Sequence, residues 1–334
     1  MAVQRRPTLA DVAERAGVSR ALVSIVMREA AGASEQTRER VKRAADDIGY
    51  RPDPRARRLR QHRTNLIGLT FAAGQEFHAD LVDGVYVAAE ALGYDVVLSA
   101  VTAHREEVRA VRTLVDDRCE GLLLIGPAQR AGQLAELADR VPLVVLARRV
   151  RGVDAVRSDD VAGARLGVEH LLGLGHRRIL FLDGGGAPGG AERLRGYRRA
   201  MQRAGQPEWI RPGGLTEREG AAAASEMVAS GGLPDAVFAF NDLCAIGVMD
   251  VFIRSGISVP QDVSVLGYDD SALAGLVHIN LSTLRQDAAG LSASAVQRLV
   301  GRLEGPAGGR DERAVDLVRE PKLIPRQTTA PPKR

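Results

Sequence analysis

Apolar residues follow two different patterns along the chain. In the first fifty residues they recur at helical spacing in three short stretches, whereas from Asn65 onward short apolar runs alternate with longer helical patterns. The first pattern predicts three packed helices. The second predicts parallel sheets, because the stretches between the runs are long enough to be helical crossovers. The expected fold class is an N-terminal all-α helix-turn-helix domain followed by an α/β module with parallel sheets in two lobes.

Capping residues mark where the N-terminal helices begin. Thr8 can cap the first helix, with Asp11 placed to bond back to it, and Gly17 ends that helix. Ser19 can cap a second helix after a turn of about three residues, a spacing typical of helix-turn-helix proteins. Ser34 can cap a third helix. An unspecialised three-helix bundle is the alternative interpretation of these features.

Side chains on the outer face of the second helix are the predicted contacts to base edges, if that helix enters a major groove. They are Arg20, Ala21, Ser24, Ile25 and Arg28. Hydroxyls at or near the helix starts can bond to phosphates. They are Thr8, Ser19, Ser34 and Thr37.

Charge is distributed unevenly between the two parts. Residues 1–64 hold 15 Lys and Arg and 8 Asp and Glu, a net charge of +7, whereas the whole chain has a net charge of +4, which leaves −3 for the remainder. A basic small unit on a slightly acidic large one indicates a polyanionic partner for the N-terminal part only. Charge alone does not distinguish that partner from a solvated basic face.

A basic segment connects the two parts. Pro52 and Pro54 break the third helix, and residues 55–60 (RARRLR) follow with one large apolar side chain, Leu59. By itself this segment is either an exposed linker or a short helix that orders only on DNA.

The N-terminal residues resemble the LacI/GalR family of bacterial transcription regulators. The matching stretches are TLADVAERAGVS at 8–19, VS at 23–24 and TRERV at 37–41. The resemblance implies that residues 51–63 contain a hinge helix, in which Ala56 and Leu59 face the minor groove and Leu59 is a wedge between base pairs. Tyr50, where the third helix ends, completes the expected DNA-binding residues.

Two positions of the second helix depart from the family pattern. The family commonly has threonine at the position of Leu22 and arginine or histidine at that of Ile25. Isoleucine cannot donate to guanine N7 or O6, so Ile25 suits contact with a thymine methyl group instead. The departure leaves the operator sequence open.

The long C-terminal part contains eight apolar runs that predict strands. They suit two doubly wound lobes, and the cleft between the lobes is the expected ligand site, because such sheets bind ligands beyond the carboxyl ends of their strands. The predicted domains are residues 1–50, 51–63 and 64–334, the last with one lobe of 64–158 and 288–325 and another of 159–284. The predicted strands are Leu66–Leu69, Val96–Leu98, Leu122–Ile125, Leu143–Leu146, Ile179–Leu182, Val237–Phe240, Val263–Leu266 and Leu281–Leu284.

The family resemblance continues through this part and implies a periplasmic-binding-protein-like module. The matching stretches are SDDVAGARLGVEHLLGLGHRRI at 158–179, RLRGYRRAM at 193–201, FNDLCAIGVM at 240–249, DVSVLGYDD at 262–270 and LSTLRQD at 281–287. It implies effector contacts by Arg193, Asn241 and Asp269 and, on the first lobe, by Phe77 and His78. From position alone, Arg193 can also be a solvated helix residue, Asn241 a helix cap and Asp269 a turn residue.

One departure from the family bears on the ligand. After the strand that ends at Leu146, many family members carry an Asp-Arg pair, whereas this chain has Ala147 and Arg148. The loss of a carboxylate that can accept a hydroxyl favours a different sugar or an anionic effector.

Other classes of protein fit less well. The glycine-rich loop at 184–190 lacks the order of a nucleotide-binding fingerprint, and Pro188 removes an amide, which argues against an enzyme built on that loop. No apolar run approaches the roughly 18 residues of a membrane span, and the absence of a secretory signal argues against an extracytoplasmic sugar-binding protein. Cys119 and Cys244 are expected to be reduced and buried, and no cofactor or metal is implied.

The sequence therefore predicts a cytoplasmic transcription regulator, most simply a repressor. It is expected to bind a near-palindromic operator as a homodimer and to respond to a sugar-like effector between its lobes. Residues 328–334 have no heptad repeat, so no tetramerising helix is expected there. The identity of the effector, and whether it releases or promotes operator binding, are left open.

Overall fold

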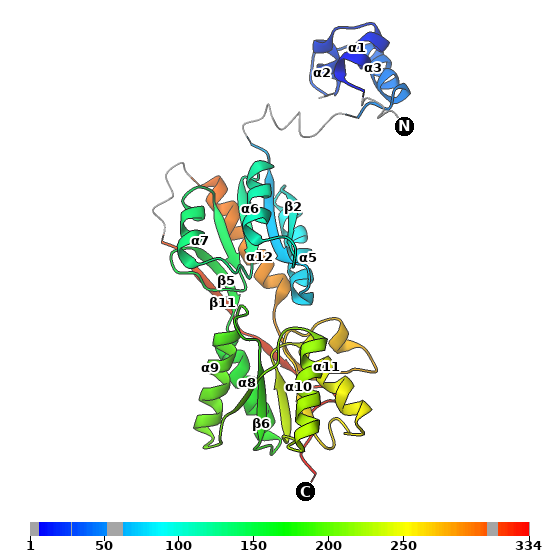
Figure 1. The fold of residues 1–334 in the computed structure, drawn as a ribbon. Coiled ribbons are helices and arrows are strands. Elements are labelled where there is room, and N and C mark those ends of the chain that lie inside the picture. Colours follow the sequence, from blue (N-terminus) through cyan, green and yellow to red (C-terminus); the bar gives the residue numbers. More distant parts are fainter. Residues whose placement is uncertain (1–6, 28, 52–62, 306–312, 334) are drawn as a thin grey trace. The chain divides into compact units, whose positions relative to one another are not determined.

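The structure is a computed structural model that describes residues 7–27, 29–51, 63–305 and 313–333. The chain divides into two compact units, Met1–Thr64 and Asn65–Arg334. Figure 1 traces the helices and strands of each unit along the chain.

The first unit contains three helices, which begin at the predicted caps. Thr8 donates from its backbone N–H and its hydroxyl to the Asp11 carboxylate at 2.6 and 2.7 Å, and Gly17 ends the first helix in the left-handed conformation at φ 62°. The second helix follows after three residues, which confirms the predicted helix-turn-helix spacing. The helices are α1 (Leu9–Ala16), α2 (Arg20–Met27) and α3 (Glu35–Asp47). Their core is small and aliphatic and consists of Val12, Ala13, Ala16, Val23, Val26, Val41, Ala44 and Ala45.

The first lobe of the second unit is built on a six-stranded parallel sheet in the order β11-β5-β4-β3-β1-β2. Helices α5 and α12 cover one face and α6 and α7 the other, and each face has its own buried apolar cluster. The strands are β1 (Leu66–Ala72), β2 (Asp95–Val101), β3 (Gly121–Ile125), β4 (Leu143–Leu146), β5 (Asp154–Ser158) and β11 (Asp316–Arg319). The helices are α5 (Glu76–Ala91), α6 (Glu107–Asp116), α7 (Ala131–Ala138) and α12 (Ala288–Glu304).

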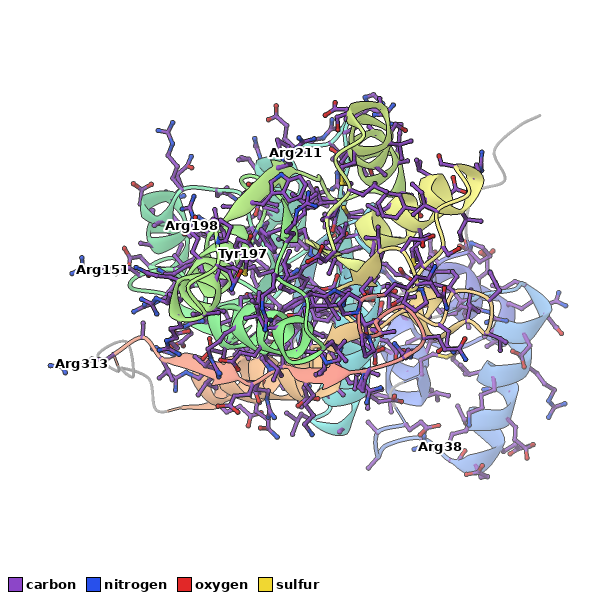
Figure 2. The ribbon with its side chains drawn as sticks, turned by 90° about the horizontal axis from the view of Figure 1, so that it is seen from below. Arg38, Arg151, Tyr197, Arg198, Arg211 and Arg313 are labelled. Carbon is purple, nitrogen blue, oxygen red and sulfur yellow. The ribbon has the colours of Figure 1, made fainter. Side chains whose placement is uncertain are left out.

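The second lobe is built on a four-stranded parallel sheet in the order β7-β6-β8-β9. Helices α8 and α9 pack on one face and α10 and α11 on the other. On α9, Tyr197 is fully buried while its neighbour Arg198 lies at the surface, as the amphipathic pattern of that helix requires (Figure 2). The strands are β6 (Ile179–Asp183), β7 (Trp209–Pro212), β8 (Ala236–Ala239) and β9 (Ser264–Leu266). The helices are α8 (Asp160–Gly173), α9 (Gly190–Arg203), α10 (Glu217–Ser230), α11 (Asp242–Arg254) and a 3₁₀ turn, η1 (Leu273–Gly275).

The chain passes between the lobes three times, from β5 to α8, from β10 (Thr283–Arg285) to α12, and from β11 to β12 (Lys322–Ile324) (Figure 1). β10 and β12 form a two-stranded antiparallel sheet. Leu323 of β12 packs on the second lobe's core, so residues 322–324 lie against that lobe rather than within the first lobe, where the sequence had placed them.

The eight predicted strands all lie at or within two residues of observed ones, but the described residues contain four more. These are β5, β7, β11 and β12. All four carry a charged residue, and β12 has only three residues, so none shows a run of apolar side chains.

Candidate functional site

The predicted base-reading face of α2 is its solvent face. Arg20 and Ala21 are exposed and Ser24 and Ile25 are half-buried, whereas Val23 and Val26 point into the core of the unit. This arrangement follows from the 3.6-residue period of the helix, which places the two valines on one side and the polar positions on the other. The side chain of Arg28 lies outside the described residues.

The predicted phosphate contacts lie at helix starts. Thr8, Ser19 and Ser34 are exposed, and Ser19 and Ser34 accept hydrogen bonds from the backbone N–H groups of Leu22 and Thr37 at 3.2 and 3.4 Å. A helix start carries partial positive charge and favours an anion.

Other predicted DNA contacts are placed differently. Thr37 is half-buried, with its hydroxyl 2.9 Å from that of Ser34. Tyr50 is also half-buried, because its ring packs against the core of the first unit. Ala56 and Leu59, the expected minor-groove residues, lie outside the described residues.

In the second unit, Arg193 of α9 is the centre of a buried ion-pair network. Its Nε lies 2.9 Å from Asp160 Oδ1, its Nη2 lies 3.6 Å from Asp269 Oδ1, and its Nη1 donates to the Phe240 carbonyl at 2.6 Å. The guanidinium stacks 3.6 Å from the centroid of the Tyr268 ring. Arg193 is 5 % exposed, so it is not a solvated helix residue.

Burial and pairing together set the protonation of this network. Burial opposes the charge on Arg193, but Asp160 and Asp269 outweigh it and raise the pKa of Arg193. Burial raises the pKa of Asp269 to about 7, although Arg193 opposes that shift. Burial, with the nearby Asp269 charge, raises the pKa of Asp242 to about 8.

Gln286 joins this network to a crossover between the lobes. Its Nε2 donates to Asp269 Oδ1 at 2.7 Å, and its Oε1 accepts from the Ser158 hydroxyl at 2.6 Å. Ser158 is the last residue of β5, and Gln286 immediately precedes the α12 crossover. Asp269 is itself held in a positive-φ conformation of 116°, which is uncommon for aspartate.

Asn241 occupies a structural position. Its Oδ1 accepts from the Cys244 backbone N–H at 2.9 Å, which caps α11, and its Nδ2 donates to the Leu215 carbonyl at 3.0 Å. The cap that was an open alternative from sequence is therefore present. One amide hydrogen and one lone pair of its oxygen are left for a further contact.

The two first-lobe candidates diverge. Phe77 is 8 % exposed and packs in the first lobe's core, so the structure gives it a core position rather than one facing a ligand. His78 accepts from the Ala72 backbone N–H at 3.0 Å through Nδ1, and burial lowers its pKa to about 4. A neutral ring that accepts at Nδ1 carries its proton on Nε2, and this atom faces Gly126, where the first lobe meets Pro188 of the second.

A cavity of about 310 Å³ lies between the lobes. Its wall comes from residues just beyond the carboxyl ends of β3, β4 and β6, the position expected for a ligand in parallel sheets. Arg193, Asn241, Asp269, Phe77 and His78 do not line it. The lining residues are Pro127, Ala128, Ala147, Arg148, Arg149, Arg157, Asp160, Gly185, Gly186, Ala187, Pro188, Gly189, Ala191 and Glu192.

Sequence reasoning missed several residues of this region. Asp160, Asp242 and Gln286 are buried and polar, but none was among the predicted site residues. A pair of acidic residues at 159–160 was the available signal, since Asp159 caps α8 through a 3.0 Å bond to the Ala162 N–H and only one of the two can do so.

Two further observations concern the cysteines and the length of the helices. Burial raises the pKa of both Cys119 and Cys244 to about 12, so both stay protonated, in line with the expected buried thiols. Among the described residues, no helix has the length and apolar character needed to cross a bilayer.

Comparisons with known proteins agree with this architecture. Residues 8–53 match the model of bacterial regulatory proteins of the lacI family, and residues 168–329 match that of a periplasmic binding protein-like domain. The transcriptional regulator CelR of Thermobifida fusca is 33 % identical over 97 % of this chain and 99 % of its own. The solved CelR–cellobiose complex is 32 % identical, with a TM-score of 0.71 over 97 % of this chain and all of that one.

Two further solved structures are similar. A LacI transcriptional regulator from a Rhodococcus species is 46 % identical and covers 80 % of this chain and 98 % of its own, with a TM-score of 0.75. The lac repressor dimer bound to operator and the anti-inducer ONPF is 29 % identical, with a TM-score of 0.82 over 98 % of this chain and all of that one. The protein is a DNA-binding transcription regulator, and it belongs to the lacI family of bacterial regulatory proteins.

Proposed function

We propose that this protein is a cytoplasmic repressor that binds a near-palindromic operator as a homodimer and changes its operator affinity when a sugar or sugar derivative binds between its lobes. One observation carries the proposal. The chain joins a capped helix-turn-helix unit, with an exposed α2 face, to a two-lobed module that has a cavity at the carboxyl ends of its strands.

DNA recognition is assigned to the first unit. Arg20, Ala21, Ser24 and Ile25 are the proposed base contacts, and the exposed hydroxyls at the starts of α1, α2 and α3 are the proposed phosphate contacts. The net charge of +7 over residues 1–64 supports this assignment, since phosphate neutralisation supplies much of the affinity for DNA.

Effector control is assigned to the second unit. A ligand that binds one arrangement of the lobes better than another shifts the balance between an operator-binding and a released form. The link from Asp269 through Gln286 to Ser158 supplies a physical connection between the lobe interior and a crossover. The ligand in the solved CelR complex is the sugar cellobiose, which supports a sugar-like effector here.

Self-association is supported by the symmetry of the expected DNA site, since an isologous dimer matches a two-fold symmetric operator. The similar lac repressor structure is a dimer bound to operator.

The decisive experiment is selection of genomic fragments by the full-length protein, repeated with a panel of sugars, sugar phosphates and nucleosides. We expect a palindromic site whose occupancy changes with one compound. An Arg20→Gln variant should lose roughly 1–3 kcal/mol of specific binding free energy. Arg165→Gln, which breaks an exposed ion pair with Glu169 on α8, should bind operator as the wild type does. Failure to recover any specific fragment under every condition would contradict the proposal.

A further inference from the structure

The cavity between the lobes has an excess of positive charge on its first-lobe wall. Arg148, Arg149 and Arg157 all line it. Arg157 makes a two-bond pair with Asp316 at 2.9 and 2.8 Å, and Arg149 lies 3.4 Å from the same carboxylate. One carboxylate therefore serves two guanidinium groups. Across the described ranges, no carboxylate lies within ion-pair distance of Arg148.

The carboxylates on the opposite wall have cations of their own. Asp160 shares Arg193 with Asp269, at 2.9 and 3.6 Å, and Glu192 lies 3.5 Å from Arg195. Among the described residues, neither wall carboxylate lies within ion-pair distance of a first-lobe arginine, so the wall that carries Arg148 favours an anion. Ala147, the neighbour of Arg148, contributes no carboxylate to the cavity.

Arg148 is oriented by the protein and still has donors to offer. Its Nη1 donates to the backbone carbonyls of Pro127 and Gln129, the latter at 2.8 Å, and its side chain is half-buried. Within the described part of the chain, its Nε and Nη2 donate to no protein acceptor. A guanidinium held in place by carbonyl groups, with part of its fork open, suits the oxygens of a phosphate or carboxylate.

The second-lobe wall adds a helix start. Ala191 and Glu192, in the first turn of α9, line the cavity, and the Asp160 carboxylate lies beside Gly189, the residue before that helix. The partial positive charge of the helix start is therefore partly offset by that carboxylate. The loop lacks a nucleotide-binding order, so the arginines are the main element and the helix start is an accessory one.

We propose that this cavity binds a sugar-sized molecule through an oxyanion, with Arg148 as its principal contact. The inference rests on the proposed function, because it names the class of effector for the same interlobe site. A volume of about 310 Å³ is at the small end of ligand cavities and suits one sugar ring with one anionic group. Asp160 on the far wall can accept a hydroxyl of the same molecule.

The test uses the full-length protein and matched sets of ligands: D-ribose and ribose 5-phosphate, D-glucose with glucose 6-phosphate and D-glucuronate, and D-fructose with fructose 6-phosphate. Affinity is measured by titration calorimetry at constant ionic strength, with inorganic phosphate as a competitor. We expect the anionic member of at least one set to bind at least about tenfold more tightly than its parent sugar. Phosphate esters and the carboxylate are separate arms, so the test also identifies which oxyanion is bound.

Variants locate the binding site. Arg148→Gln should remove most of the preference for the anion, and Arg149→Gln, whose side chain is 71 % exposed, should reduce it by a smaller factor. Arg165→Gln is the matched control and should leave it unchanged. The absence of any anion preference, or a preference that survives in Arg148→Gln with a native circular dichroism spectrum, would overturn the inference.

Operator binding separates this inference from the proposed function. If a neutral sugar alone shifts operator affinity, the proposed function stands and the anionic class is wrong. If an anion binds through Arg148 but no operator is ever recovered, the ligand class stands and the proposed function is wrong.

Discussion

At the scale of single residues, the second unit depends on charges removed from water. Arg193 lies between Asp160 and Asp269, and the side chains of all three are at most 13 % exposed. A buried ion-pair network of this kind adds little stability over apolar residues of the same volume. Removal of one charged partner alone is costly, because it leaves the remaining buried charges uncompensated. The network is therefore sensitive to changes at one position.

Replacement of Arg193 by methionine should expose this sensitivity. The variant leaves Asp160 and Asp269 without their cation, so we expect the free energy of unfolding to fall by about 3–5 kcal/mol. Urea denaturation followed by circular dichroism measures the change. Arg165→Gln, which breaks an exposed pair with Glu169, should cost less than about 1 kcal/mol. Equal losses of unfolding free energy in the two variants would contradict the prediction that the buried network is the more sensitive site.

The raised pKa values of Asp242 and Asp269, about 8 and 7, predict a pH dependence. An unfolded aspartate loses its proton near pH 4, whereas these two keep theirs in the folded state until pH 7–8. Between those limits the folded state binds more protons, so the free energy of unfolding should decrease as pH rises from about 4 to 9 and should not change further from this cause above about pH 9.

Asp242→Asn tests the assignment. The carboxylate accepts from the Ser271 N–H at 2.7 Å and from the Thr283 hydroxyl at 2.6 Å, and an asparagine can keep the first bond and donate to the hydroxyl in the second. The decrease in stability between pH 5 and 8 should be smaller in this variant. A slope identical to that of the wild type would show that Asp242 does not titrate there.

At the scale of elements, the sequence predicted the helix caps and strands that depend on residues close together in the chain. The caps at Thr8 and Ser34 were predictable because a hydroxyl or carboxylate must meet the first free amides of a helix. Strands buried on both faces, such as β3 and β8, were predictable from their apolar runs. β11 has all four residues exposed, and it is a strand because it pairs with β5, some 160 residues earlier in the chain.

The candidate site was less predictable than the fold. Arg193 and Asp269 were identified through the family resemblance, and the structure joins them. The pairing of Arg193 with Asp160, and of Gln286 with Ser158, depends on side chains that are distant in sequence and meet only in three dimensions. No periodic pattern or capping residue in the sequence indicates such contacts.

Gln286→Leu tests whether the crossover contact transmits the effector signal. The substitution removes the bonds to Asp269 and Ser158 but keeps a side chain of similar size. We expect the ratio of operator affinities without and with effector to shrink by roughly tenfold, within the usual range of allosteric coupling. Fluorescence anisotropy with labelled operator measures both affinities. An unchanged ratio would mean that the signal passes through the other crossovers.

At the scale of the whole molecule, charge divides the tasks between the two units. The basic balance lies in residues 1–64, and the remainder has a net charge of −3. DNA is therefore expected to attract the first unit and not the second. The effector module can then change operator affinity without contributing its own nonspecific attraction to DNA.

Salt dependence provides the test of this division. A dimer that neutralises 6–10 phosphates should lose about 10³- to 10⁵-fold in operator affinity between 50 and 200 mM salt, because each contact releases a condensed counterion. Lys42→Gln, on the exposed side of α3, should make the slope of log affinity against log salt shallower, because it removes a cation from the first unit, whereas Arg254→Gln, on α11 of the second unit, should leave the slope as in the wild type. Operator binding that is insensitive to salt, or as sensitive to Arg254→Gln as to Lys42→Gln, would contradict a basic reader confined to the N-terminal unit.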